Sequence, residues 1–334
     1  MAETASPNHN PEIGAGIDAS GLVTNYHDAG SGKPVVLPHG SAPAVTAWAN
    51  WRLTIPELAP HHHVLAPDIT GFDYTDNTAD DRYDLAIRQD HLITSFDAPD
   101  LVRIAAIDAS IGGAPALAVN HPQRVERLVL MGAAELDFAL TPGLDAVWGY
   151  QPSLENMRAL MHLLAWDRHL ISEDLVQMRY QASARDGVQQ SYGGMFPAPR
   201  QNGIQSLAQA EEDVAAIDHQ ALIVHGCDDK MIPLGISLRL HQLIPRSQLR
   251  SSATGPRSSM RIAAHAWSTI FSENSNCRTG SVRHNDPSTT RRRRKHGYRP
   301  NSKQHRKNSS SAGPLDTVRL RLHHSHSLRF GFFG

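Results

Sequence analysis

The feature that most constrains the fold is an apolar run that ends in a turn of small residues and continues with helical period. Residues 105–119 read AAIDASIGGAPALAV, with Ser110 at the turn. A serine on a sharp strand-to-helix turn is lifted above the end of a sheet, as in the nucleophile elbow G-x-S-x-G. Here the five residues are DASIG, so Asp108 stands where the first glycine is usual. Small residues at such a turn also serve close packing, and the motif alone leaves both interpretations open.

Apolar runs alternate with segments of helical period on both sides of this turn. Strands are expected over 23–27, 35–37, 63–66, 101–107, 125–131 and 221–226, with a further short strand at 248–249, and helices over 48–58, 83–96 and 234–243. Strands and helices that alternate at this spacing predict an α/β fold, a mostly parallel sheet with helices on both faces.

Breaks in the alternation predict the domain organisation. We expect a flexible N-terminus (1–20), a first part of the α/β core (21–136), a helical cap (137–207), a second part of the core (208–249) and a basic, low-order tail (250–334). The cap segment carries helical patterns over 154–166 and 173–182 and no clear strand. The tail is rich in Arg, Ser and His and has no sustained apolar period, which is typical of disorder.

Charge and cysteine content exclude several classes of protein. The formal net charge of the whole chain is -1, which predicts no strong attraction to nucleic acid outside the tail, where residues 291–295 read RRRRK. Only Cys227 and Cys277 are present, which is compatible with a reducing cytoplasm. No run approaches 18 apolar residues, and the N-terminus has no signal-peptide pattern, so we expect neither a membrane span nor export.

Three candidate functional segments each follow a predicted strand. His39, Gly40 and Ser41 follow the strand at 35–37, Ser110 lies on the elbow, and Asp229 closes the segment HGCDD after the strand at 221–226. Loops at the carboxyl ends of parallel strands meet at one edge of the sheet, where such folds place their chemistry. We therefore expect a serine hydrolase site at this edge.

Several longer segments give a specific resemblance. Residues 24–28 (TNYHD), 47–53 (AWANWRL), 128–133 (LVLMGA), 143–149 (GLDAVWG) and 195–200 (MFPAPR) resemble the meta-cleavage product hydrolases. These are C–C bond hydrolases of aromatic degradation within the α/β-hydrolase superfamily. The resemblance covers residues 10–249 and implies the α/β-hydrolase fold.

The resemblance implies a reaction and its catalytic residues. The substrate would be a 2-hydroxy-6-oxohexa-2,4-dienoate formed by ring opening, which is ketonised, attacked by the serine at its C6 carbonyl and cleaved. Ser110 would be the nucleophile, activated by a histidine that Asp229 orients. The N–H groups of Ser41 and Ile111 would form the oxyanion hole. Asp228 is interpreted as a neighbour of the acid.

Two further residues match the family's binding positions. Arg179 would bind the substrate carboxylate, for which a guanidinium fork is suited, and Asn50 would make a polar contact near the same end. Arg179 could equally be a solvated charge on a helix, and Asn50 could serve packing. The resemblance implies no cofactor and no metal, a small-molecule ring-fission product as partner, and a homo-oligomer as a common state.

The chain departs from the family pattern where the catalytic histidine is expected. A Gly-His-Trp segment should follow the strand at 248–249, but the chain reads RSSATGPRSSMRIA from Arg250. With one permitted choice of codons, reading two nucleotides later gives VFGHWAQIEHADR, which contains that segment. Our hypothesis is a frameshift near codon 250, which resequencing the gene tests. Further departures are Pro38, Ala42, Ala44, Asp73, Asp108 and Ala109.

The missing histidine leaves alternatives open. His225 and His265 are the nearest candidates for a substitute base, with His225 favoured as structural. Activity of the chain could therefore be impaired. The alternative functions are a carboxylesterase-like hydrolase of the same fold, and an inactive hydrolase-fold protein whose basic tail binds nucleic acid.

Overall fold

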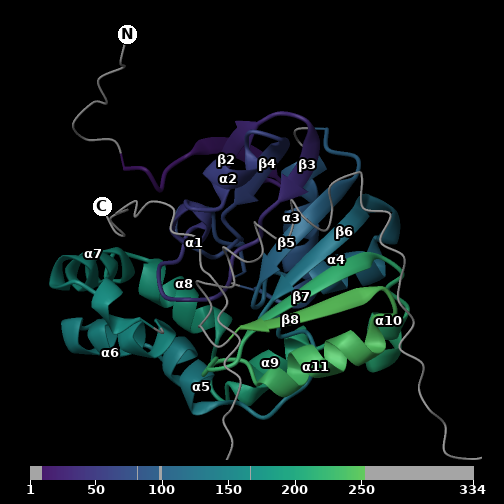
Figure 1. Cartoon of the computed structure of the whole chain (residues 1–334). Helices are drawn as coiled ribbons and strands as arrows, with labels where there is room; N and C mark the ends of the chain where they lie inside the picture. Colours follow the sequence, from purple (N-terminus) through teal and green to yellow (C-terminus); the bar gives the residue numbers. More distant parts are fainter. Residues whose placement is uncertain (1–9, 81, 98–99, 166, 253–334) are drawn as a thin grey trace, which may run out of the picture. The chain divides into compact units, whose positions relative to one another are not determined.

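An eight-stranded sheet organises the structure, a computed structural model that describes residues 10–80, 82–97, 100–165 and 167–252 (Figure 1). The strands are β1 (Ala15–Ala19), β2 (Leu22–Gly30), β3 (Lys33–Val36), β4 (His62–Pro67), β5 (Ile104–Ala109), β6 (Val125–Met131), β7 (Gln220–Gly226) and β8 (Ser247–Ser252), in the order β1-β2-β4-β3-β5-β6-β7-β8. β1 and β2 pair antiparallel, as do β2 and β4, and every other pair is parallel. The expected mostly parallel sheet is confirmed.

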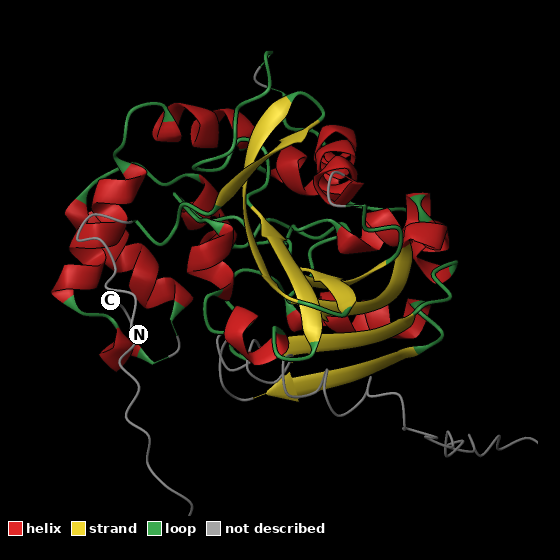
Figure 2. Ribbon diagram, turned by 90° about the horizontal axis from the view of Figure 1, so that it is seen from above, coloured by secondary structure: helices red, strands yellow, loops and turns green. Residues whose placement is uncertain are grey.

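Helices cover both faces of this sheet (Figure 2). One face packs against α3 (Leu85–Asp97), α4 (Ala114–Asn120), α10 (Glu211–Ala215) and α11 (Leu234–Leu243), and the other against α1 (Ala47–Trp51) and α2 (Ile55–Leu58). The neighbours Val35 and Val36 of β3 belong to these two different cores. Alternate residues of a strand point to opposite faces, so a central strand that is apolar throughout fills both layers.

Residues 137–207 form a third packed group, which contains no strand among its described residues. Its helices are α5 (Pro142–Trp148), α6 (Leu154–Leu164), α7 (Glu173–Ser183), α8 (Val188–Met195) and α9 (Gln201–Leu207). α5 to α8 gather to the left of the sheet in Figure 1. Their core includes Trp148 and Tyr192 and also takes in Ile111, next to Ser110, so these helices pack over the carboxyl ends of the strands. None of the helices within the described ranges is long and apolar enough to cross a membrane.

The structure corrects the expected N-terminus. The prediction of a flexible segment over 1–20 is wrong for Ala15–Ala19, which pairs with β2 as β1. Ser20 and Gly21, with φ of 55° and 78°, form the two-residue turn between them. Two consecutive positive φ values are what a tight hairpin turn requires, and the Asp18 carboxylate accepts a hydrogen bond from the Gly21 N–H.

Other boundaries also differ from the prediction. The helix expected over 48–58 is two short helices, because Pro56 offers no N–H and its ring would clash with the carbonyl four residues earlier. The strand expected over 101–107 begins only at Ile104. β8 continues to Ser252, so residues 250–252 belong to the sheet and not to the predicted tail. The rest of that tail, 253–334, lies outside the described residues.

Candidate active site

Ser110 lies on a strained turn between β5 and α4. Its φ is 58°, a left-handed conformation that is uncommon for a residue with a side chain. The Ser110 N–H donates to the Met131 carbonyl at 3.0 Å, and the Ser110 carbonyl accepts from the Ala134 N–H at 3.0 Å. Both backbone groups are thus tied to the chain leaving β6, and strain held by its surroundings is typical of functional sites.

Two glycines allow the close approaches around this turn. A Cβ on Gly112 would overlap the Asp108 carboxylate and lie 2.8 Å from the Cβ of Pro38, so no larger residue fits between β5 and the start of α4. A Cβ on Gly40 would lie 3.3 Å from the Cβ of Ser110. The loop after β3 therefore packs directly against Ser110, where an oxyanion hole must be.

Two neutral side chains, His39 and Trp148, hold the Gly40 loop in place. His39 is fully buried; its Nδ1 donates to the Gly40 carbonyl at 2.8 Å, and its Nε2 accepts from the Ile69 N–H at 2.9 Å. Burial lowers the pKa of His39 to about 4, so the ring stays neutral as this pair of bonds requires. From α5, the Trp148 Nε1 donates to the Ser41 hydroxyl at 2.9 Å while its ring stacks on Phe196.

The two expected oxyanion donors are available. Within the described ranges, the backbone N–H groups of Ser41 and Ile111 donate no hydrogen bond. Ser41 precedes a short loop to α1, and Ile111 directly follows Ser110. Both N–H groups come from segments that the contacts above bring to the Ser110 turn, which is the arrangement an acyl-transfer site uses.

Asp229 lies beyond the end of β7, close to the same point. Its Oδ1 accepts from the N–H groups of Met231 at 2.7 Å and Ile232 at 3.1 Å, which fixes the carboxylate. A Cβ on Gly132 would lie 3.3 Å from its Oδ2, and Gly132 follows the residue whose carbonyl binds the Ser110 N–H. Ser110 and Asp229 therefore flank the same two residues at the end of β6. Asp228, by contrast, is exposed.

A pocket of about 410 Å³ opens at Asp229. Apolar residues of α6, together with His162, form one wall, and Asp228, Asp229, Lys230 and Met231 form another. The pocket lies between the helical segment and the loop that carries the acid. A small organic molecule or a further chain segment fits a space of this size.

Among the described residues, no histidine hydrogen-bonds the Ser110 hydroxyl. The His225 ring is buried with Nδ1 2.7 Å from the Ser237 hydroxyl and Nε2 3.1 Å from the Ile232 carbonyl, so both nitrogens have partners. Burial lowers the pKa of His225, and this ring joins β7 to α11. His265 lies outside the described residues. Within the described ranges, no side chain hydrogen-bonds the Ser110 hydroxyl.

Arg179 bridges α7 to the Gly40 loop. Its guanidinium donates to the carbonyls of Pro43, at 3.3 Å, and Ala44, and lies 3.4 Å from the Glu12 carboxylate. Its side chain is 16% exposed, so it is not the solvated charge that was the alternative. Asn50 lies on α1, and its side-chain nitrogen is buried without a partner among the described residues.

Sequence reasoning missed Glu12, the bracing role of His39 and the anchoring of Ser41 by Trp148. All three depend on contacts between segments far apart in the chain, for which no local pattern exists. Within the described ranges, no group of three or more His, Cys, Asp or Glu side chains is arranged to hold a metal ion.

Comparison with known proteins gives the class to which this fold and site correspond. The family model described as alpha/beta hydrolase fold matches residues 33–259, and the chain belongs to this family. The 2-hydroxymuconate semialdehyde hydrolase of Pseudomonas sp. (strain CF600) is 48% identical over 246 residues, which is 73% of this chain and 87% of that protein. The 2-hydroxy-6-oxo-2,4-heptadienoate hydrolase of Pseudomonas putida is 51% identical over 244 residues, 72% of this chain and 88% of that protein.

A solved structure narrows the class further. The meta-cleavage product hydrolase of Pseudomonas fluorescens IP01 is 43% identical, covers 78% of this chain and 100% of its own, and superposes with a TM-score of 0.75. Within the α/β hydrolases, the chain is a member of the meta-cleavage product hydrolases. The resemblance inferred from the sequence is confirmed.

Proposed function

We propose that the site of this chain is built to hydrolyse a C–C bond in 2-hydroxy-6-oxohexa-2,4-dienoate-type products of ring cleavage. The observation that carries the proposal is that Ser110, the Gly40 loop and Asp229 meet at the same edge of the sheet. Ser110, with φ of 58°, has the Gly40 loop packed against it, and Asp229 lies next to Gly132, the residue after the one whose carbonyl binds the Ser110 N–H. The named relatives act on compounds of this class.

The proposed steps assign a role to each residue. After ketonisation of the substrate, the Ser110 oxygen adds to the C6 carbonyl as a base takes its proton. The N–H groups of Ser41 and Ile111 stabilise the resulting oxyanion, each contributing about 3–4 kcal/mol. The C–C bond then breaks, its electron pair and a proton go to the leaving carbon, and water releases the acyl group from Ser110.

Arg179 would bind the substrate carboxylate, and Asn50 would contact the same end. Glu12 now occupies one side of the Arg179 guanidinium, so a substrate carboxylate would exchange for Glu12 in the same charge-assisted contact. The unpartnered side-chain nitrogen of Asn50 is a donor that such a polar group would satisfy.

Turnover of the present chain should be slow, because no described side chain hydrogen-bonds the Ser110 hydroxyl and the sequence after Leu249 lacks the Gly-His-Trp segment that carries the family's base. Serine hydrolases that lose a triad member retain a roughly 10³–10⁴-fold acceleration over water through the oxyanion hole and binding. We therefore propose an impaired hydrolase. A cytoplasmic location and a homo-oligomeric state are proposed with it, whereas nucleic-acid binding rests only on the composition of residues 250–334 and is not proposed.

The test compares two substrates on purified protein. Hydrolysis of the dienoate is measured from the loss of its absorbance. We expect kcat/KM, divided by the uncatalysed rate in buffer, to be higher for the dienoate than for a p-nitrophenyl ester. Arg179→Leu should remove this preference by raising KM for the carboxylate-bearing substrate alone, because the ester has no carboxylate to bind. A chain that prefers the ester would favour a carboxylesterase. An Arg179→Leu variant that keeps the dienoate preference would contradict the proposed contact between Arg179 and the substrate carboxylate.

A further inference from the structure

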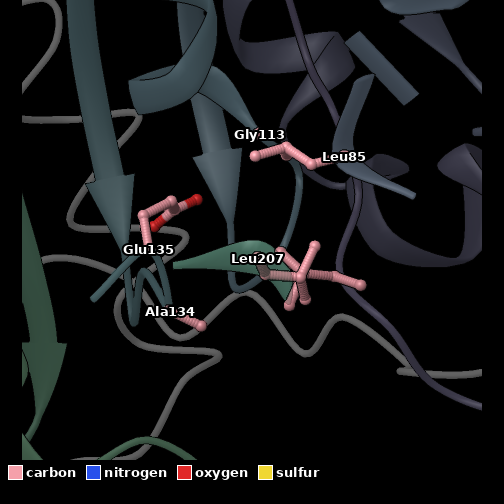
Figure 3. A pocket seen from close by; sticks show the side chains of 6 residues that line it. Leu85, Gly113, Ala134, Glu135 and Leu207 are labelled. Atoms are coloured by element: carbon pink, nitrogen blue, oxygen red, sulfur yellow. The ribbon is translucent and has the colours of Figure 1, made fainter. Parts of the chain in front are cut away.

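Two carboxyl groups lie buried together beneath the Ser110 turn. Asp108 is on β5, two residues before Ser110, and Glu135 follows β6; their exposed fractions are 0% and 2%. Figure 3 shows Glu135 on the wall of a small pocket that Gly113, at the start of α4, also lines. The two carboxyls influence each other, since each is among the groups that set the pKa of the other.

The hydrogen bonds of this pair are incomplete. Asp108 Oδ2 accepts from the Ala114 N–H at 3.2 Å. Asp108 Oδ1 and both oxygens of Glu135 accept no well-formed hydrogen bond among the described residues. Nearby N–H groups, including those of Gly112 and Ala134, lower the two pKa values but do not offset burial. A buried carboxylate oxygen without a donor is costly, and two adjacent carboxylates also repel each other. One proton between Asp108 and Glu135 removes a charge and supplies the missing donor.

The elements packed around the pair bring no cation to it. α3 carries two buried titratable groups, Arg88 and His91, and neither hydrogen-bonds the pair. Arg88 lies over the Phe196 ring at 5.6 Å, with its Nε and Nη1 unpartnered among the described residues, and His91 contacts the Thr24 hydroxyl at 2.8 Å. His39, after β3, is neutral. The helices α4 and α9 contain no charged side chain. Burial raises the pKa of Asp108 to about 7, and burial followed by repulsion from Asp108 raises the pKa of Glu135 well above its usual range.

Asp108 is positioned to transmit the state of the pair to the active site. One carboxylate oxygen lies against Gly112, where a Cβ would overlap it, and the other binds the Ala114 N–H at the start of α4. Ile111, a proposed oxyanion donor, lies between Ser110 and Gly112. A displacement of the Asp108 carboxylate therefore has to move the backbone of the turn.

We propose that Asp108 and Glu135 form a proton-sharing acid pair that holds the Ser110 turn closed, and that the turn loosens when the shared proton is lost. Both are positioning residues, since neither touches the reacting atoms. The inference goes beyond the proposed function and does not depend on it, because it concerns the folded state and not turnover.

The pair should make stability fall as pH rises. A carboxyl whose folded pKa is raised above its unfolded value binds more protons in the folded state, so unfolding becomes easier with increasing pH. For Asp108, the loss of stability begins at about pH 4, the usual pKa of an aspartate, and is complete above about pH 7, the pKa in the folded chain. For Glu135 the loss extends to higher pH.

The test measures thermal unfolding of the full chain and of Asp108→Asn, Glu135→Gln and Asp137→Asn at pH 5 and pH 8.5. Glu135→Gln keeps the Asp108–Ala114 bond and adds a donor, so its fold has no missing contact. We expect both pair variants to raise the unfolding midpoint at pH 8.5 by about 5 °C or more and to change it little at pH 5. The exposed Asp137 is the matched control, with the same change of charge and no pH-dependent difference. Asp68, another buried acid, is present in the parent chain and in every variant, so its contribution to the pH dependence cancels in the differences between midpoints.

Hydrogen exchange over residues 108–120 gives the second measurement. In the parent chain, this segment should exchange faster at pH 8.5 than at pH 5 after correction for the intrinsic rate, and Glu135→Gln should abolish the difference. Midpoint shifts that are equal at the two pH values would mean a purely structural role and overturn the proposal. An unchanged exchange difference in Glu135→Gln would also overturn it.

Discussion

A chain whose residues from position 250 carry the shifted-frame segment VFGHWAQIEHADR and its continuation will hydrolyse the dienoate at least about 10⁴ times faster than the present chain. The physical reason is the base. A serine hydroxyl is too weakly acidic to attack unaided, and loss of the triad histidine lowers kcat by about 10⁶-fold in a well-studied protease. The kcat of both chains is measured from the absorbance of the dienoate under saturating substrate.

The control for this experiment is the restored chain with its new Gly-His-Trp histidine replaced by glutamine. That variant differs from the restored chain only in the base, and its rate should fall to that of the present chain. Equal rates in the restored and present chains would contradict the frameshift hypothesis and would mean that some residue beyond Ser252 already acts as the base.

In the restored chain, Asp229→Asn should lower kcat by about 10⁴-fold, and Asp228→Asn should change it less than threefold. Asp229 is fixed by the N–H groups of Met231 and Ile232 and lies near Gly132. An asparagine would keep the shape but present an N–H to the histidine, which favours the wrong tautomer, and a loss of about 10⁴ follows in serine proteases. Asp228 is exposed and serves as the matched control.

Two results for these variants would contradict the assignment of Asp229. If Asp228→Asn caused the larger loss, the roles of the two neighbouring acids would be exchanged. If neither mattered, the acid would come from elsewhere, and the proximity of Asp229 to Gly132 would be structural only.

The parts of the fold that local sequence determines could be predicted. The bounds of β6 and α11 match the expected 125–131 and 234–243, because each is an uninterrupted apolar pattern of one period. The Ser110 turn was also expected, since small residues are required where a strand turns back into a helix. The Ser20–Gly21 hairpin and the break at Pro56 also have local signals, a turn glycine and a proline, which the apolar period alone does not use.

The contacts that complete the site could not be predicted from local sequence. The Arg179–Glu12 contact joins residues 167 positions apart, and its sequence signal is only an arginine on a helix. The Asp108–Glu135 pair is of the same kind. Asp108 was visible as a departure from the elbow motif, but nothing in the sequence indicates that Glu135 is buried against it, because burial of a charge is decided by tertiary packing.

The central claim is that Ser110 is the nucleophile of a C–C bond hydrolase, and peptide mass spectrometry of the restored chain tests it most directly. The protein is mixed with the dienoate, quenched in acid during turnover and digested. We predict that the acyl fragment of the substrate is attached to Ser110, and that Ser110→Ala shows neither the attachment nor turnover. An acyl group on another residue, or full turnover in Ser110→Ala, would contradict the account.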